Sequence, residues 1–494
     1  MAKYVLAIDQ GTTGSTAILV SPEGETRGKA TTEFPQHFPK PGWVEHDARE
    51  IWASVAASVS SALAAARVDA HDVAAIGITN QRETTLVWDK KTGEPIHRAV
   101  VWQCRRTADV CDRLKAEGHA RSILEKTGLV IDAYFSGTKV AWILDHVEGA
   151  RARAQRGELA FGTIDSYLIH MLTGGGVHVT DATNASRTLL MNLSRVAWDA
   201  SLCELFRVPE SMLPKIVGSA EPIATTRGVG FLPDGIPIAG IAGDQQAALF
   251  GQACFAEGDA KCTYGTGAFA LVNIGERPVL SDAGLVTTVA WQLGGKTTYA
   301  LEGSSFIAGA AVQWLRDGLG IIRSAEEIEA LAAKVDSSGG VAFVPALAGL
   351  GAPYWDQGAR GTITGITRGT TAAHLARATL EGIAFQVRDL LAAMARDAKR
   401  DVARLRVDGG AARNDLLMQF QADIGPVKVE RPHEIESTGR GAAMLAAVGA
   451  GLAKMEDASR RVRIERSFEP TMTEGDRAAH LARWSDAILR ARSR

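Results

Sequence analysis

Short apolar runs that stop at polar or glycine-rich turns recur along the chain. The first run, Val5–Ile8, ends at Asp9-Gln-Gly-Thr-Thr-Gly14, and a second run covers residues 17–20 before a turn at 21–24. An apolar run of this length between turn residues is typical of a buried strand. The pattern therefore predicts a β-hairpin whose tight turn carries glycine and threonine.

A helix and a further strand follow this hairpin. Apolar residues at 51, 55, 59 and 63 have helical spacing, and Asp47 with Glu50 fits a capping box at the start of that helix. Residues 74–79 form the next apolar run, which ends in Asn80-Gln-Arg-Glu83. Polar residues at the carboxyl end of a buried strand are where open α/β sheets place ligand contacts.

The second half of the chain repeats this organisation. One predicted strand, 238–243, leads into Asp244 and a short helix to Gly251, and another, 260–264, leads into Gly265-Thr-Gly267. The pattern also predicts a long helix over 372–399 and a strand over 405–407, with Asn414 as the cap of the next helix. Two similar strand–turn units, one in each half, indicate an internal duplication. We expect an α/β protein with domains at 1–251 and 252–494.

Length and charge restrict the class of protein. At 494 residues the chain is too long for one ordinary core, and a net charge of −2 provides no general attraction for nucleic acid or anionic membranes. The longest run of small apolar residues, 442–453, is shorter than the roughly 18 residues that a membrane span needs. The amino-terminal apolar run is too short for a signal-peptide core. These features predict a cytoplasmic protein with no integral membrane segment and no nucleic-acid partner.

Cysteine, histidine and glycine each add one expectation. The five cysteines form no Cys-x-x-Cys pair, which predicts buried, reduced thiols. The histidines lack metal-ligand spacing, and we expect surface or loop positions for His37, His46, His71, His97, His170 and His178. The 51 glycines have no fixed period, which predicts many tight turns in which the backbone comes close to a neighbouring group.

Three glycine turns are candidates for nucleotide contacts, and each has a simpler interpretation. The turn from Asp9 to Gly14 could cradle phosphate with Asp9 near Mg²⁺, or it could be a plain hairpin turn. Gly265-Thr-Gly267 could hold a second phosphate or could be only a tight turn. Asp408-Gly-Gly-Ala411 with Asn414 suits a base or ribose, and equally suits a helix entry.

Two charged positions are candidates for substrate chemistry. Arg82 and Glu83 could clamp neighbouring hydroxyl groups of a polyol, or could be a solvated salt bridge. Asp244 follows an apolar strand, so burial could raise its pKa and suit it to general-base work, although a helix N-cap is the alternative.

Long blocks of sequence carry a resemblance to a known family. They cover residues 39–47, 77–84, 101–107 and 240–251, and two broader patterns cover 134–146 and 361–381. Over nearly its whole length the chain resembles the glycerol-phosphorylating members of the FGGY carbohydrate kinase family. The resemblance implies two ribonuclease H-like domains of the actin and sugar-kinase type, with an interdomain cleft that holds nucleotide and substrate.

The resemblance also implies roles for individual residues. The glycerol pocket corresponds to Arg82, Glu83, Trp102, Tyr134, Asp244, Gln245 and Phe269. The ATP contacts correspond to Thr12, Thr13, Gly14, Thr266, Gly309, Gln313, Gly410 and Asn414. Asp9 corresponds to the acid near Mg²⁺, directly or through water, with Asp244 as a second acid near the metal. The implied reaction is in-line phosphoryl transfer from MgATP to glycerol, giving sn-glycerol 3-phosphate in glycerol catabolism, with Asp244 as general base. A homodimer or homotetramer is the implied assembly.

The chain departs from the family pattern at several places. Well-studied bacterial members have an arginine where this chain has Thr16 and a serine where it has Gly14. The loop 227–235 lacks the pattern that binds fructose 1,6-bisphosphate and the histidine phosphorylated in some relatives, and 470–484 differs from the segment that docks a sugar-transport regulator. We expect none of these controls here. Gly439-Arg440 replaces two apolar residues.

Two other functions compete with this one. Another FGGY kinase would act on xylulose, ribulose or erythritol, against which the blocks at 80–83 and 102–107 argue. A non-catalytic, actin-like nucleotide-binding scaffold would not need Asp244 and a complete polyol pocket.

Overall fold

The first of two large sheets is built mainly from the amino-terminal half. In this computed structural model, which describes residues 3–493, the sheet has the order β13-β14-β5-β1-β2-β3. β1, β5 and β14 are parallel, whereas β2 is antiparallel to both β1 and β3. The strands are β1 (Tyr4–Gln10), β2 (Gly14–Val20), β3 (Thr26–Glu33), β5 (Val73–Asn80), β13 (Ala220–Thr225) and β14 (Pro237–Gly243).

The second sheet repeats the pairing pattern of the first. Its order is β17-β18-β16-β15-β21-β22-β23, in which β15, β21 and β22 are parallel and β16 is antiparallel to β15 and β18. The duplication expected from the sequence is therefore confirmed. The strands are β15 (Asp259–Tyr264), β16 (Ala268–Gly275), β17 (Val286–Leu293), β18 (Lys296–Ser305), β21 (Arg404–Asp408), β22 (Val429–Pro432) and β23 (Ile464–Phe468).

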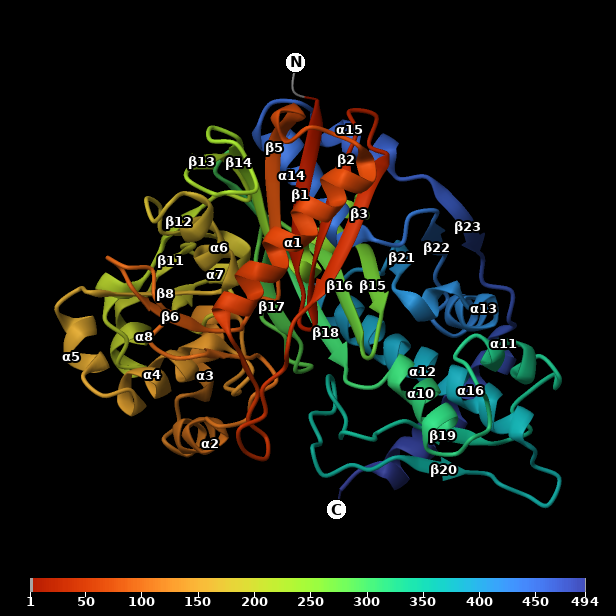
Figure 1. Ribbon diagram of the computed structural model, residues 1–494. Helices are drawn as coiled ribbons and strands as arrows, with labels where there is room; N and C mark the ends of the chain where they lie inside the picture. Colours follow the sequence, from red (N-terminus) through yellow and green to blue (C-terminus); the bar gives the residue numbers. More distant parts are fainter. Residues whose placement is uncertain (1–2, 494) are drawn as a thin grey trace.

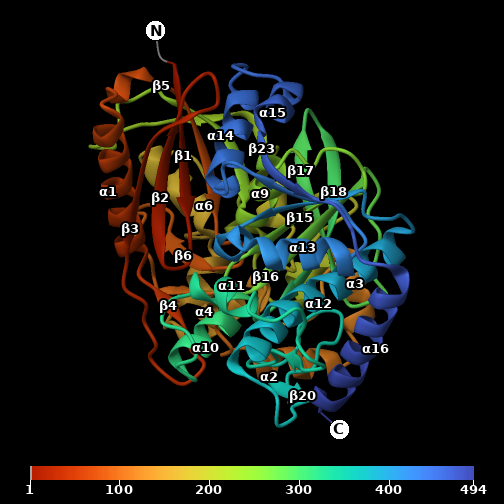
Figure 2. The ribbon, with the colours of Figure 1, turned by 90° about the vertical axis from the view of Figure 1, so that its right-hand side faces the viewer.

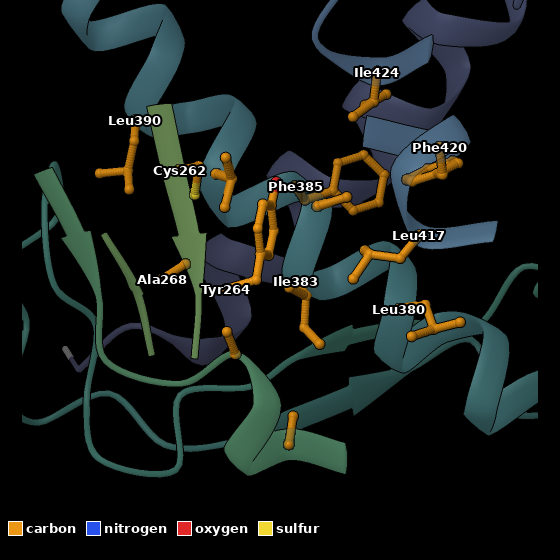
Figure 3. Packing of buried hydrophobic residues seen from close by; sticks show 14 of the residues in the cluster. Cys262, Tyr264, Ala268, Leu380, Ile383, Phe385, Leu390, Leu417, Phe420 and Ile424 are labelled. Atoms are coloured by element: carbon orange, nitrogen blue, oxygen red, sulfur yellow. The ribbon is translucent and has the colours of Figure 1, made fainter. Parts of the chain in front are cut away.

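Each sheet is covered by a long helix that follows its antiparallel strands. α1 (Ala48–Ala66) packs on β2 and β3, and α12 (Ala372–Ala398) packs on β16 and β18. Figure 2 shows α1 on the outer side of the first sheet. In the core of the second half, α12 and α13 (Asp415–Ile424) bring Phe385 and Phe420 together with their ring centroids 5.4 Å apart (Figure 3).

Two helices join the halves. α9 (Asp244–Gly251) follows β14, and α14 (Ser437–Gly449) follows β22. α14 packs on β1, β5 and β14 of the first sheet as well as on α9, so a late segment covers an early sheet (Figure 1). A Cβ atom added to Gly441 would lie 1.8 Å from the Ala247 carbonyl oxygen, and one on Gly77 would lie 2.1 Å from the Ala442 carbonyl oxygen. These two glycines therefore permit α14 to pack closely on α9 and on β5, and neither lies in a turn.

The remaining elements surround these sheets. Between β3 and β14 lie β4 (Glu45–His46), β6 (Leu86–Asp89), β7 (Ala99–Val100), α2 (Ala108–Ala116), α3 (Ala120–Thr127), α4 (Ser136–His146), α5 (Ala150–Gln155), β8 (Leu159–Gly162), α6 (Ile164–Leu172), β9 (Val179–Asp181), α7 (Ala182–Ala185), β10 (Met191–Asn192), β11 (Ala197–Trp198), α8 (Ala200–Leu205) and β12 (Lys215–Val217). The second half adds α10 (Gly309–Asp317), α11 (Glu327–Ala332), β19 (Ala342–Val344), β20 (Thr362–Thr364), α15 (Met455–Arg461) and α16 (Glu474–Ala491). Over residues 3–493, no helix is both long and apolar enough to cross a membrane.

Most predicted elements are present, with boundaries that move by a residue or a few. Asp47 caps α1 by accepting a hydrogen bond from Arg49 N at 2.9 Å, and Asn414 caps α13 by accepting one from Leu417 N. The predicted capping box of α1 is wrong, because Glu50 is drawn away by His37, whose Nε2 lies 2.8 Å from Glu50 Oε2. The five cysteines are buried and free, as expected.

Candidate active site

The candidate residues of the first half meet because three parallel strands end at one edge. In the register of the sheet, Asn80 at the end of β5 lies opposite Gln10 of β1 on one side and Gly243 of β14 on the other. The segments that follow β5 and β14 therefore start side by side, next to the turn that follows β1. Sequence positions near 9, 82 and 244 become neighbours for this topological reason.

Arg82 is the centre of the cluster. Its Nε lies 3.1 Å from Asp244 Oδ1, its Nη2 lies 3.2 Å from the Tyr134 hydroxyl, and its Nε lies 3.6 Å from Glu83 Oε1. Arg82 and Glu83 are each only 2% exposed, so the alternative of a solvated salt bridge is wrong. A buried arginine with several acceptors is fixed in orientation, which suits a group that positions hydroxyls.

Two further charged residues belong to this cluster, and the sequence interpretation missed both. Glu302 on β18 accepts hydrogen bonds from Arg82, with Nη2 to Oε1 at 2.8 Å, and from Arg187 at 3.1 Å. Arg187 also donates through Nε to Glu83 Oε1 at 2.8 Å. The available signal was a lone carboxylate inside the apolar run Tyr299-Ala-Leu-Glu-Gly303 of β18. The negative charge of Glu302 lowers the cost of burying two guanidinium groups. Burial alone would raise the pKa of Glu302, but the two arginines hold it low, at about 2.

Asp244 is the first residue of α9, and its environment suits a base. Gly243, rather than Asp244, is the N-cap, so the N-cap alternative is wrong. Loss of solvation raises the pKa of the Asp244 carboxyl, Arg82 opposes this rise, and the charge of Glu83 adds to it. A carboxylate with a raised pKa accepts a proton more readily at neutral pH.

Asp9, on β1, lies near enough to Asp244 for the two negative charges to repel each other. Loss of solvation raises the pKa of Asp9 to about 7, and the negative charge of Asp244 is the next cause. Residues 3–493 contain no group of three acidic, histidine or cysteine side chains arranged to hold a metal ion. Two carboxylates that repel each other fit a divalent cation such as Mg²⁺, which commonly takes one or two protein carboxylates and completes its shell with water and substrate phosphate.

Aromatic residues connect the substrate candidates to the first glycine turn. The Trp102 indole Nε1 donates a hydrogen bond to Thr12 Oγ1 at 2.9 Å, and the Trp102 and Tyr134 rings meet edge to face with centroids 5.6 Å apart. Thr12, a predicted nucleotide contact, therefore touches Trp102, a predicted substrate contact. The two predicted subsites are continuous at this point.

One face of the second sheet, the face that carries Glu302, borders the cluster around Arg82. Phe269 of β16 lies opposite Thr263 and Ser304 in the register, and Leu271 lies opposite Glu302. Because opposed residues and residues two apart share a face, Phe269 lies on the face that carries Glu302. On that face Lys261 Nζ donates to the Gln245 side chain and, at 2.8 Å, to Thr263 Oγ1. Lys261 is a further buried charge that the sequence interpretation missed.

The nucleotide candidates of the second half fall into two adjacent groups. Ala308 N donates to the Thr266 carbonyl at 2.8 Å, and a Cβ on Gly309 would lie 2.7 Å from the Gly265 carbonyl, which joins Thr266 and Gly309. Gly409, beside Gly410, packs similarly on Tyr264. Gln313 is exposed on α10, and Gly410 has open space where a Cβ would be. No hydrogen bond within residues 3–493 links these groups to the turn of Thr12, Thr13 and Gly14.

Thr16 and Gly439 are two positions at which the chain departs from the family pattern, and each makes a specific local contact. Thr16 Oγ1 lies 2.9 Å from Thr31 Oγ1, so a neutral hydroxyl pair occupies the place of the family arginine. Gly439 leaves room for Ile18, whose Cδ1 would lie 2.6 Å from an added Cβ, and it lies beside Asp9.

The predicted surface or loop positions are wrong for His46 and His170, which are both buried. His46 is fully buried, with Nε2 2.6 Å from Gln36 Oε1 and Nδ1 3.3 Å from Gln81 Nε2. Burial lowers the pKa of His46 to about 4, and nearby His37 contributes. His170 is buried as well, and burial lowers the pKa of His178 to about 4. Isolated histidines give no periodic signal, so burial could not be inferred from sequence.

Comparison with protein families gives two matches that together cover most of the chain. Residues 4–251 match the N-terminal domain of the FGGY family of carbohydrate kinases, and residues 260–450 match the C-terminal domain of that family.

Individual relatives agree with the family match. A glycerol kinase of Myxococcus xanthus is 58% identical over 493 residues, covering 99% of this chain and 99% of that protein, and one of Deinococcus radiodurans is 58% identical over 491 residues, covering 99% and 98%. The crystal structure of Plasmodium falciparum glycerol kinase with ADP has a TM-score of 0.94 at 35% identity, covering 99% of this chain and 98% of that one. A xylulose kinase of Lactobacillus acidophilus matches at 23% identity with a TM-score of 0.88, covering 99% and 97%, which shows a shared fold.

Proposed function

Because the chain belongs to the FGGY family of carbohydrate kinases, we propose that it transfers a phosphoryl group from ATP to glycerol, giving sn-glycerol 3-phosphate. The chain is a kinase, and the relatives that support glycerol as its substrate match it from end to end. The observation that carries the proposal is the cluster of Arg82, Glu83, Tyr134 and Asp244, in which Arg82 and Glu83 are buried and Tyr134 and Asp244 are partly exposed. Fixed donors and acceptors of this kind suit vicinal hydroxyl groups.

In the proposed reaction, Asp244 accepts the proton of a primary hydroxyl of glycerol. The freed oxygen attacks the γ-phosphorus in line, its bond to phosphorus forms, and the bond to the β-phosphate oxygen breaks to release ADP. The raised pKa of Asp244 supports this role, because proton transfer is most efficient when the pKa of the base is near the working pH.

The remaining residues would bind and orient the reactants. Arg82 and Glu83 would hold the other hydroxyls, Tyr134 and Gln245 would complete the polar wall, and Trp102 and Phe269 would limit the length of the carbon chain. Phosphoryl transfer depends mainly on such positioning and on charge neutralisation. The residues assigned to ATP are Thr12, Thr13, Gly14, Thr266, Gly309, Gln313, Gly410 and Asn414.

Asp9 and Asp244 would hold Mg²⁺, directly or through water. When bound, Mg²⁺ would neutralise phosphate charge. In its absence, the repulsion between the two carboxylates helps to raise the pKa of Asp9.

A substrate panel tests the proposal. Purified protein would be assayed for ADP release, by a coupled reaction, with glycerol, xylulose, ribulose and erythritol at matched concentrations. We expect glycerol to have the highest kcat/KM. A higher kcat/KM with another polyol would assign a different substrate, and ATP binding without glycerol-dependent ADP release would indicate a scaffold.

A further inference from the structure

A cavity lined by four arginines and four glutamates lies outside the candidate active site. It has a volume of about 460 Å³ and is lined by four segments: the β2–β3 turn (residues 23–26), the end of α9 (251–252), the region from the end of β22 into α14 (432–440), and residues 460–465 from the last turn of α15 into β23. None of its lining residues belongs to the substrate, nucleotide or acidic sets described above. The cavity therefore needs an explanation of its own.

Arg440 is the most buried charge in this cavity. It lies in the first turn of α14, and its side chain is 10% exposed. Its Nη2 donates to the Gly24 carbonyl at 3.3 Å, while Glu434, its nearest carboxylate, is 3.8 Å away. Loss of solvation lowers the pKa of Arg440, the charge of Glu434 opposes this effect, and the neighbouring Arg461 and Arg463 lower the pKa further. Arg440 is thus a buried cation whose charge is only weakly compensated by protein groups.

The other charges around the cavity leave positive charge in excess. Glu25 pairs with Arg27 at 2.9 Å, and Glu465 pairs with Arg431 at 3.0 Å. Neither Arg27 nor Arg431 lines the cavity, so these two carboxylates are already neutralised from outside it.

Two further arginines of the wall are not neutralised in this way. Arg461 donates through Nη2 to the Pro22 carbonyl at 2.7 Å, and Arg463 is exposed. Within residues 3–493, neither of them forms an ion pair with a carboxylate. The fourth lining arginine, Arg460, pairs with Asp457, which lies outside the cavity, at 3.7 Å. Of the other lining carboxylates, Glu23 is exposed and only weakly influenced by Arg461, and Glu434 lies 3.8 Å from Arg440.

We propose that this cavity binds a small anion carrying a phosphate group, with Arg440, Arg461 and Arg463 as its donors. Guanidinium groups present several N–H donors in a fixed plane that matches phosphate oxygens. A dianion there would compensate the buried charge of Arg440. Because the wall includes both the β2–β3 turn and the segment before β23, the ligand would bridge early and late parts of the chain.

Calorimetry on the full-length protein tests this site. The candidate active site is first saturated with glycerol and a non-hydrolysable ATP analogue with Mg²⁺, and the protein is then titrated with inorganic phosphate and, separately, with phenyl phosphate. We expect one phosphate-binding site per chain. A lower Kd for phenyl phosphate would show that the cavity also accommodates an organic group, whereas an equal Kd would identify the phosphate ion as the whole ligand.

Three variants locate the binding. Arg440→Leu should weaken phosphate binding at least tenfold, and Arg463→Gln severalfold, whereas Arg121→Leu, at an exposed arginine of α3, should leave it unchanged. Arg463 is exposed, so its variant remains informative if Arg440→Leu does not fold. Absence of phosphate binding by the wild type, or equal binding by the wild type and both cavity variants, would overturn the proposal. The experiment measures no turnover, so its result is independent of the proposed kinase reaction.

Discussion

Arg82 Nε lies 3.1 Å from the carboxylate of Asp244, and this contact joins the end of one strand to the start of the helix after another. The same guanidinium group reaches Glu302 on the second sheet. One side chain thus connects the proposed base, the polyol clamp and both halves of the fold. Its charge opposes the rise in the pKa of Asp244, so Arg82 keeps that carboxyl more ionised than loss of solvation alone would.

Asp244→Asn should abolish most turnover and leave glycerol binding nearly intact. The amide keeps the shape of the side chain but cannot accept the hydroxyl proton, so we expect kcat to fall by about 10²-fold or more. Coupled ADP release would give kcat, and calorimetry would give the Kd for glycerol. Asp259→Asn, at a carboxylate paired with Arg404, is the matched control and should retain kcat. Near-normal turnover by Asp244→Asn would refute the assignment of the base.

Glu302→Gln should destabilise the protein strongly, because it removes the negative charge between two buried arginines. Breaking a buried ion pair from one side leaves an uncompensated charge, and we expect the free energy of unfolding to fall by about 3 kcal/mol. Urea denaturation would measure it. Glu25→Gln breaks a pair that is about half exposed and should change the stability by less than about 1 kcal/mol. Equal effects of the two variants would contradict the structural role of Glu302.

Gly441→Ala should disrupt the packing of α14 on α9. The new Cβ would lie 1.8 Å from the Ala247 carbonyl oxygen, so one helix must shift, at a cost of about 2 kcal/mol or more. Gly475→Ala, in the first turn of α16, meets no atom within 4 Å and should be neutral or stabilising by about 0.5 kcal/mol. Thermal unfolding of both variants would compare them. A Tm of Gly441→Ala at or above the wild-type value would show that the interface is looser than described.

His46→Asn should remove one pH-dependent part of the stability. The pKa of folded His46 is about 4, below the 6.5 of an unfolded histidine, so the unfolded chain binds a proton first as the pH falls. The stability contributed by neutral His46 is therefore complete above pH 6.5 and is lost as the pH falls through 4. We expect the difference in unfolding free energy between wild type and variant to shrink by about 2 kcal/mol between pH 6.5 and 4.5.

Denaturation curves at several pH values would measure this difference. Phe34→Leu is the control, because Phe34 packs against His46 with ring centroids 5.0 Å apart but does not titrate. Its destabilisation should be the same at each pH. If the stability difference between wild type and His46→Asn stayed constant with pH, the pKa of His46 would be the same in the folded and unfolded states, which would contradict the lowered pKa.

Elements set by neighbouring residues could be predicted from the sequence. The β1–β2 hairpin, the caps at Asp47 and Asn414 and the long α12 depend on apolar spacing and turn residues within a few positions. Glu50 shows the limit of such patterns: a capping box is local, but a histidine thirteen positions away competes for the same carboxylate. The resemblance to the family supplied Trp102 and Phe269, which periodicity alone did not single out.

By itself, the sequence determined the strand–turn units, their duplication and the polar residues that follow buried strands, because these features depend on local spacing. Only the tertiary structure decided which charges are neutralised and by what. Glu302 meets Arg82 across 220 positions, and Arg440 reaches Gly24 across 416. Such contacts depend on how two sheets and α14 pack together, and packing over that sequence distance leaves no periodic trace. The same reason explains why the sequence did not indicate the roles of Gly77 and Gly441, which lie where α14 packs closely on β5 and on α9.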